Sequence, residues 1–182
     1  MAPPRLFDLS AIDLNATALD RVGIMKYIAQ RGLALQLDKL AWFSEDRNRA
    51  VAVKHVRDDE WWSAGHVPGQ PLMPAVMMIE AGAQLASVIF QIHDVIHHKF
   101  IGFTAIDRTK FRGVVHPGDD LIILGQVFKF HPRRMICDLQ GWVGDDLIYE
   151  SRITGMPIDP DGGSLSDALA DSTVPAVPSL PH

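Results

Sequence analysis

The sequence has little cysteine, no excess of positive charge, and none of the common motifs of nucleotide-binding proteins or serine hydrolases. Its 182 residues include one cysteine, Cys137, so an internal disulfide and a zinc site built from several cysteines are both excluded. The formal net charge is −5, which argues against a general affinity for nucleic acid or for an anionic membrane. The sequence contains no GxSxG, no P-loop and no GxGxxG. The first residues lack the basic-then-apolar pattern of a signal peptide, so we expect a cytoplasmic protein.

Length and composition predict one folded domain with a segment of different character at each end. With 47% hydrophobic and 21% charged residues, the chain has the composition of a globular protein, and its length suits a single core. Residues 1–16 begin with paired prolines near the start and show no hydrophobic period, so we expect an extended arm. We place the domain at residues 17–157. Residues 158–182 are rich in Pro, Gly, Ser and Asp, and we expect them to be disordered and dispensable for folding.

The first half of the domain reads as a short helix, two strands and a loop rich in glycine and proline. Residues 17–30 predict a helix with Val22, Met25 and Ile28 on one side. Alternating apolar residues then predict two strands, at residues 35–42 and 50–53. The loop, residues 65–74, contains two glycines and three prolines, which fix the path of the backbone.

A long helix is predicted over residues 75–92, because the run after Pro74 is rich in Ala, Met and Ile and contains no proline. This helix is apolar around most of its circumference, so it must be buried on most sides. Four polar residues interrupt it, which argues against a membrane span: Glu80, Gln84, Ser87 and Gln91. They form one stripe, and such stripes usually face water, so periodicity alone favours a solvent-exposed Glu80.

Five further strands are predicted after the helix, at residues 100–107, 109–115, 121–130, 135–143 and 147–154. A sheet of this size needs one face covered, and only one helix is long enough to cover it. The fold class is therefore α+β, with an antiparallel sheet wrapped around one long central helix. The other face and the edges of the sheet would be exposed in a monomer, so we expect the protein to form oligomers.

His66 and Glu80 have the residue types and surroundings that best suit acid–base chemistry. A histidine in the glycine- and proline-rich loop titrates near neutral pH and can act as a general base. A carboxyl group on the buried helix should have a raised pKa, as a proton donor needs. Each also has an ordinary interpretation, as a loop histidine bonded to backbone and as a solvated glutamate. Three other histidines suit a helix end better than a metal site, because no HExxH motif accompanies them: His93, His97 and His98.

Two blocks of the sequence closely resemble the FabZ-type 3-hydroxyacyl-[acyl-carrier-protein] dehydratases, a hotdog-fold family. Residues 65–84 read GHVPGQPLMPAVMMIEAGAQ, against a family pattern of G-H-F-P-G-x-P-x-x-P-G-V-x-x-I-E-A-x-A-Q. Residues 105–119, AIDRTKFRGVVHPGD, are similar as well, and the resemblance extends over residues 28–154. The sequence departs from the pattern at Val67, where the family has Phe, and at Ala75, where it has Gly.

The resemblance favours catalytic roles for both His66 and Glu80. It implies dehydration of (3R)-3-hydroxyacyl thioesters to trans-2-enoyl thioesters, without a metal or redox cofactor, on the phosphopantetheine arm of acyl carrier protein. His66 would abstract the C2 proton, and Glu80 would protonate the departing C3 hydroxyl. The backbone amide of Ala75 would stabilise charge on the thioester oxygen. Three further residues would contact the substrate: Pro74, Gln84 and Phe103.

The resemblance also implies homodimers, often assembled as trimers of dimers, in which each active site takes His66 from one protomer and Glu80 from the other. Carrier protein is acidic, so its docking surface should be locally basic. The candidates, any of which can equally be ordinary surface charge, are Lys110, Arg112, Arg133 and Arg134, together with Lys99 and Arg108. Two other functions remain open: an acyl-CoA thioesterase of the same fold, and a non-catalytic acyl-binding subunit. The presence of both acid–base residues argues against the second, because a binding module needs neither.

Overall fold

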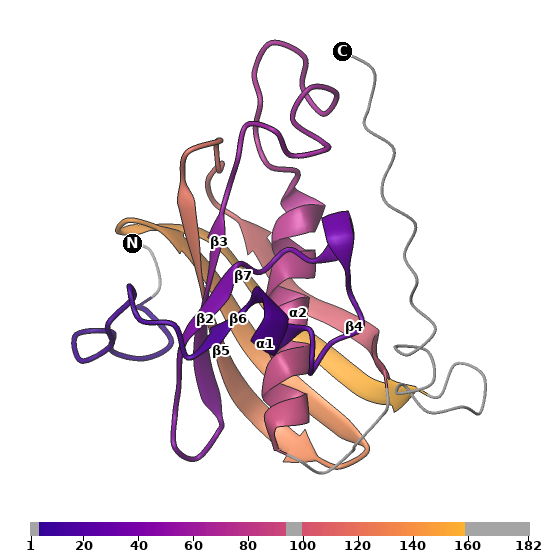
Figure 1. Cartoon of the computed structure of the whole chain (residues 1–182). Coiled ribbons are helices and arrows are strands. Elements are labelled where there is room, and N and C mark those ends of the chain that lie inside the picture. Colours follow the sequence, from indigo (N-terminus) through magenta and orange to yellow (C-terminus); the bar gives the residue numbers. More distant parts are fainter. Residues whose placement is uncertain (1–3, 94–99, 159–182) are drawn as a thin grey trace.

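One antiparallel sheet of seven strands curves around a single long helix in the computed structural model, which describes residues 4–93 and 100–158 (Figure 1). The strands lie in the order β1-β2-β3-β5-β6-β7-β4. Their bounds are β1 Leu19–Asp20, β2 Lys39–Phe43, β3 Arg49–His55, β4 Phe100–Phe111, β5 Asp120–His131, β6 Arg134–Val143 and β7 Asp146–Ile158. The helical elements are α1 Arg21–Ile24, the 3-10 turn η1 Gly32–Ala34 and α2 Ala75–Ile92. The α+β class and the sheet wrapped around one helix are confirmed.

Helix α2 lies close against the inner face of the sheet, because glycines stand at the points of nearest approach. A Cβ atom at Gly82 would be 2.5 Å from the hydroxyl oxygen of Tyr149, and one at Gly125 would be 2.8 Å from Ile89 Cδ1. The predicted bounds of this helix are confirmed. By length and apolarity α2 resembles a membrane span, but most of its residues are buried inside the sheet, as in the core helix of a folded domain.

The predicted helix over residues 17–30 is wrong in its length and in its buried face. Only Arg21–Ile24 is α-helical, directly after the two-residue strand β1. Val22 is exposed, whereas Ile24 and Ile28 are buried in the main core. After Ile24 the chain leaves the helix, and Ile28 packs into the main core. Tertiary packing therefore overrides a weak local preference for helix.

The strand predicted to begin at Leu35 begins instead at Lys39. Leu35 and Leu37 are buried, but the guanidinium group of Arg21 donates to their carbonyl oxygens at 3.2 and 3.3 Å. The same guanidinium donates to the Asp38 carboxylate at 2.9 Å. These bonds supply the partners that a neighbouring strand would otherwise provide, because buried backbone groups must be satisfied.

The strands predicted at residues 100–107 and 109–115 are a single strand, β4, with an irregularity near its end. Its register with β7 shifts between Asp107 and Lys110, where Arg108 adopts φ 51°. Strand β4 forms one edge of the sheet and carries three exposed apolar residues: Phe103, Ile106 and Phe111. A long apolar edge strand is a surface suited to pairing with another chain. The other predicted strands are confirmed with slightly longer bounds, as β3, β5, β6 and β7.

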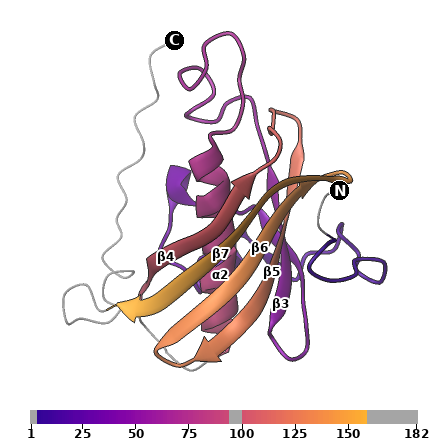
Figure 2. The same ribbon diagram turned by 180° about the vertical axis from the view of Figure 1, so that it is seen from behind.

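The N-terminal arm packs on the outer face of the sheet, the face away from α2 that Figure 2 presents. Three of its side chains, Leu6, Phe7 and Leu9, contact a small cluster formed by Leu124, Trp142 and Leu147. The Gln140 side chain accepts from the amide of Leu6 at 2.9 Å and donates to the carbonyl of Pro4 at 3.0 Å. Part of the outer face is therefore covered within one chain, where the sequence analysis expects it to be exposed.

Strand β7 extends to Ile158, the last residue that the structure describes. Ile158, which the sequence analysis assigns to the tail, pairs with Phe100 of β4. The rest of the predicted tail, residues 159–182, lies outside the described residues, as do His97, His98 and Lys99.

Candidate active site

The loop that carries His66 stands above the amino end of α2 (Figure 1). The His66 amide donates to the carbonyl of Trp62 at 2.8 Å, which closes a tight turn directly before the histidine. A second turn follows, in which the Gln70 amide donates to the Val67 carbonyl at 3.0 Å. Gly69 has φ 80° in that turn, a conformation that glycine adopts without steric cost. Two successive turns therefore present the histidine ring at the surface of the loop.

The imidazole of His66 is exposed and held in one tautomer by the backbone. Its Nδ1 lies 3.0 Å from the carbonyl oxygen of Leu72. A carbonyl oxygen only accepts hydrogen bonds, so Nδ1 must carry the hydrogen of the neutral ring. The Nε2 atom is then left with a free lone pair. This arrangement prepares His66 to accept a proton at Nε2.

Glu80 lies on the core helix α2, whereas His66 lies on an exposed loop. Its Oε1 accepts from the side-chain amide of Gln84 at 2.8 Å, and the side chain of Gln30 also hydrogen bonds to it. Burial raises the pKa of the Glu80 carboxyl, and the two hydrogen bonds oppose this effect only in part. A raised pKa keeps a larger share of the carboxyl protonated near neutral pH, as a general acid requires.

The polar stripe of α2 is not a solvent-exposed face, because Gln84 and Ser87 are buried and Glu80 is half-buried, so the solvent-exposed interpretation of Glu80 is wrong. Gln84 is fully buried beneath η1 and the residues around it. Its Oε1 accepts from the Gln36 amide at 2.9 Å, and its Nε2 donates both to the Ala34 carbonyl at 2.7 Å and to Glu80. Both of its amide hydrogens and its oxygen are thus used, which fixes the orientation of the side chain and holds the Glu80 carboxyl in place.

The amino end of α2 presents backbone amides without a side-chain cap. Pro74 is the N-cap residue, with φ −57° and ψ 134° and no side-chain hydrogen bond, and Ala75 is the first helical residue. The first amides of a helix have no acceptor within the helix, and the helix dipole adds partial positive charge at this end. Val76, the next residue, is largely exposed. This end of α2 can therefore stabilise a negative oxygen.

Among the predicted substrate-contacting residues, Pro74 and Gln84 lie on or beside α2, whereas Phe103 lies apart from them within one chain. No hydrogen bond joins His66 to Glu80 in the described part of the protein. Phe103 lies near the start of β4, whereas the residues after β4 return to the loop, where the Met73 amide donates to the carbonyl of Val115 at 2.8 Å. About 25 Å of strand separates the two ends, so Phe103 is distant from His66 of its own chain.

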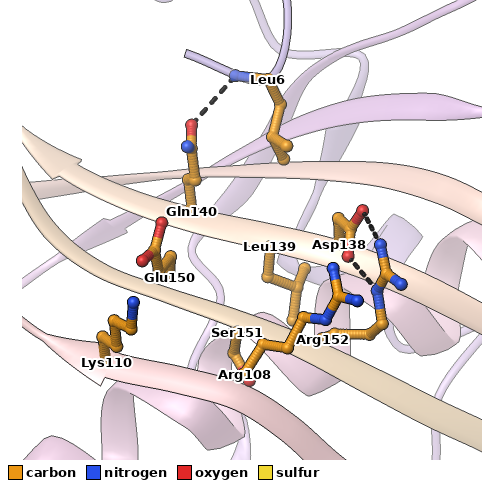
Figure 3. A pocket seen from close by; sticks show the side chains of 9 residues that line it. All are labelled: Leu6, Arg108, Lys110, Asp138, Leu139, Gln140, Glu150, Ser151 and Arg152. Carbon is orange, nitrogen blue, oxygen red and sulfur yellow. Dashed lines mark hydrogen bonds and ion pairs between the residues drawn. The ribbon is translucent and has the colours of Figure 1, made fainter. Parts of the chain in front are cut away.

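The four basic residues predicted to dock a carrier protein fall into two groups. Lys110 borders a cavity of about 400 Å³ on the outer face of the sheet, together with Arg108, Asp138 and Arg152 (Figure 3). Arg112 makes an ion pair with Glu150. Arg133 and Arg134 lie instead at the hairpin between β5 and β6, near the other end of β7. One contiguous basic patch does not contain all four.

Three polar residues near the candidate site were not predicted from the sequence: Gln30, Lys54 and Glu60. Gln30 contributes to the environment of Glu80. Lys54 and Glu60 form a buried ion pair at 2.6 Å beneath the start of the loop that carries His66. The only signal was a lysine on the alternating run of β3, at a position where the pattern calls for an apolar residue. His93 stacks on Phe130, with ring centroids 4.3 Å apart.

Comparisons with known proteins place the chain in a family. A model described as a FabA-like domain matches residues 28–152. A 3-hydroxyacyl-[acyl-carrier-protein] dehydratase FabZ of Alkaliphilus metalliredigens is 36% identical over 145 residues, which cover 79% of this chain and 97% of the relative. A FabZ of Rhizobium rhizogenes is 33% identical over 156 residues, covering 81% and 94%.

Solved structures support the fold. The dehydratase heterocomplex ApeI:P of Xenorhabdus doucetiae gives a TM-score of 0.66 at 12% identity, covering 80% of this chain and 96% of the matched chain. A sigma28-regulated virulence protein of Campylobacter jejuni gives 0.60 at 14% identity, covering 81% and 96%. The chain belongs to the FabA-like family of hotdog-fold proteins, and its curated relatives are FabZ-type dehydratases.

Proposed function

We propose that the protein dehydrates (3R)-3-hydroxyacyl thioesters on acyl carrier protein to trans-2-enoyl thioesters, in fatty-acid or related lipid biosynthesis in the cytoplasm. The observation that carries the proposal is the contrast between two proton-transfer groups, one on the loop before α2 and one on α2 itself. His66 holds a free lone pair at Nε2, and Glu80 is a partly buried carboxyl with a raised pKa. The names of the curated relatives agree with this chemistry.

The reaction removes one hydrogen from C2 and the hydroxyl group from C3. His66 Nε2 takes the C2 proton, and the electron pair of that bond moves toward the thioester carbonyl. The Ala75 amide donates to the carbonyl oxygen as negative charge develops there. Glu80 gives its proton to the C3 hydroxyl, which leaves as water while the C2–C3 double bond forms. One proton is taken and one is given, so the elimination is redox-neutral and needs no redox cofactor.

Each active site in this proposal combines residues of two protomers. The apolar edge of β4 offers a pairing surface, and Phe103 on that edge can reach a substrate bound beside the loop of a second chain. An acyl chain has little room inside one subunit, where α2 fills the concave face of the sheet. A dimer, with a trimer of dimers as the larger assembly, provides a tunnel between chains.

The carrier protein docks on basic residues near the site in the same proposal. Lys110 and Arg112 lie toward the end of β4 that returns to the His66 loop, so they suit this role best. Arg133 and Arg134 lie at the far hairpin, where they would serve a site to which a partner chain contributes. Attraction between opposite charges would increase the association rate more than the final affinity.

The decisive assay supplies 3-hydroxyacyl thioesters of several chain lengths, on carrier protein and on coenzyme A, and follows the absorbance of the enoyl product. We expect enoyl formation with at least one chain length and faster turnover on the carrier protein. The thioesterase alternative predicts instead the release of free thiol, which a thiol reagent detects in the same reaction. Thiol release without enoyl formation would refute the dehydratase.

A further inference from the structure

The Lys54–Glu60 ion pair is the most deeply buried pair of charges in the described part of the protein. Lys54 Nζ and Glu60 Oε1 are 2.6 Å apart, and the two side chains are 1% and 6% exposed. In every other ion pair among the described residues, at least one partner is more than a quarter exposed. Lys54 lies on β3, on the face that Ala50 and Ala52 turn toward α2.

Stability alone does not account for this pair. Removing a charge from water costs several kcal/mol, and the attraction between the partners repays that cost only with good geometry. Apolar side chains of similar volume often give equal or greater stability at such a position. A buried ion pair does have one property that an apolar contact lacks, which is a strict requirement for distance and direction. It can therefore set the path of a flexible segment.

The segment that Lys54 holds leads directly to His66. The Glu60 carbonyl accepts from the Ser63 amide at 2.8 Å, and the Trp62 carbonyl accepts from the Gly65 amide at 3.2 Å and from the His66 amide at 2.8 Å. The Trp62 side chain is buried in the main core. The backbone from Glu60 to His66 is thus a short series of turns with its first residue anchored by a buried charge. Arg57 adds a second cation 3.4 Å from the Glu60 carboxylate.

We propose that Lys54 and Glu60 are positioning residues, which hold the His66 ring in the orientation where Nδ1 donates to the Leu72 carbonyl and Nε2 is free. Among the described residues no hydrogen bond or ion pair joins Lys54 or Glu60 to the His66 side chain, so the pair acts through the turns between residues 60 and 66. The catalytic consequence rests on the proposed function, since it assumes that Nε2 accepts the substrate proton. The orientation of the ring does not depend on that assumption.

The test replaces both charges together, because a single replacement leaves an unpaired buried charge and lowers stability by itself. We choose Lys54→Met with Glu60→Leu, and Lys54→Gln with Glu60→Gln as a second double variant in case the first does not fold. A matched control removes another ion pair on the far face of the sheet, by Arg152→Met with Asp138→Leu. Lys54→Arg keeps the charge and is the conservative variant.

The primary readout is the tautomer of His66, measured by nitrogen-15 NMR of the imidazole above its titration range. We expect the wild type, the control pair and Lys54→Arg to show the Nδ1-protonated form, and the Lys54/Glu60 double variant to show a mixture of both tautomers with its melting temperature largely retained. With short coenzyme A thioesters as substrates, kcat of the double variant should fall about tenfold or more at nearly unchanged KM.

The tautomer decides the proposal whatever the activity shows. A folded double variant that keeps the wild-type tautomer overturns it, and so does a control pair that loses the tautomer to the same extent. If the wild type has no dehydratase activity, the proposed function fails, but the NMR comparison still tests the positioning role.

Discussion

His66 and Glu80 are held in opposite ways, and the difference matches the two tasks of an acid–base pair. The histidine stands on an exposed loop, where its ring is fixed by one bond to a backbone carbonyl. The glutamate stands on the core helix, where burial raises its pKa and a fully bonded glutamine holds it. A base needs access to its substrate and a pKa near neutrality, whereas an acid at neutral pH needs a site that disfavours its charged form.

Of all the changes considered, removing His66 or Glu80 should have the largest effect on turnover. We expect His66→Ala and Glu80→Gln each to lower kcat by about 10²-fold or more, because each removes one proton-transfer partner. Neither change opens a large apolar cavity, so circular dichroism and melting should show a folded protein. Near-normal turnover in either variant would exclude that residue from the chemistry.

Mixing the two variants shows whether the base and the acid of one site come from different chains. If His66→Ala and Glu80→Gln protomers assemble at random, about half the dimers are mixed. Each mixed dimer then has one site with both residues intact, so roughly a quarter of all sites recover activity. Co-expressed protein with confirmed mixed dimers and no recovered activity would show that each site lies within one chain.

Replacing Gln84 keeps the Glu80 carboxyl but removes the hydrogen bond that holds it, so this variant tests the effect of that bond alone. In Gln84→Met the carboxyl loses one donor that favours its charged form, so the pKa of Glu80 should rise further. The alkaline limb of the kcat profile, which reports loss of the acidic proton, should move to higher pH, and kcat at pH 7 should fall about tenfold. Ser87→Ala, in the same polar stripe, is the control. An unchanged pH profile would show that Gln84 does not tune Glu80.

The buried carboxyl should also make stability depend on pH. Burial raises the pKa of Glu80 in the folded protein, so the folded chain holds this proton to a higher pH than the unfolded chain does. The contribution of Glu80 to stability is therefore largest below its ordinary pKa, and is lost as pH rises through the folded pKa. We expect the melting temperature of Glu80→Gln, relative to that of the wild type, to increase from pH 5 to pH 8. A constant difference would contradict the raised pKa.

A substitution on the outer face of the sheet should have the smallest effect on activity but a measurable effect on stability. Phe7 of the arm contacts Trp42 with ring centroids 5.9 Å apart and packs against the small outer cluster. Phe7→Ala should lower the free energy of unfolding by about 2 kcal/mol, because the ring is only partly buried. The melting temperature should fall by about 4–8 °C, with kcat at 25 °C unchanged. No change in melting temperature would mean that the arm does not stabilise the sheet.

Local sequence pattern determined the helix over residues 75–92 and most strands, because both depend on the spacing of apolar side chains within one segment. The resemblance of the two motif blocks singled out His66 and Glu80 as candidates and predicted the family, which the comparisons confirm. Local pattern failed where contacts between distant segments decide the structure. Periodicity alone predicted that Glu80 faces water, since nothing in the helix itself reveals that Gln30, a residue of a distant segment, hydrogen bonds to it.

Only the tertiary structure decided which polar residues are buried and which groups they hydrogen bond or pair with. Gln84 bonds the backbone of Gln36 and Ala34, 48 and 50 positions away, and Leu6 of the arm bonds Gln140 across 134 positions. Lys54 lies on the core-facing side of β3, but nothing in the local pattern shows that Glu60 is its buried partner. Burial and hydrogen bonding of a polar side chain depend on what the rest of the chain places around it, and local spacing carries no information about that.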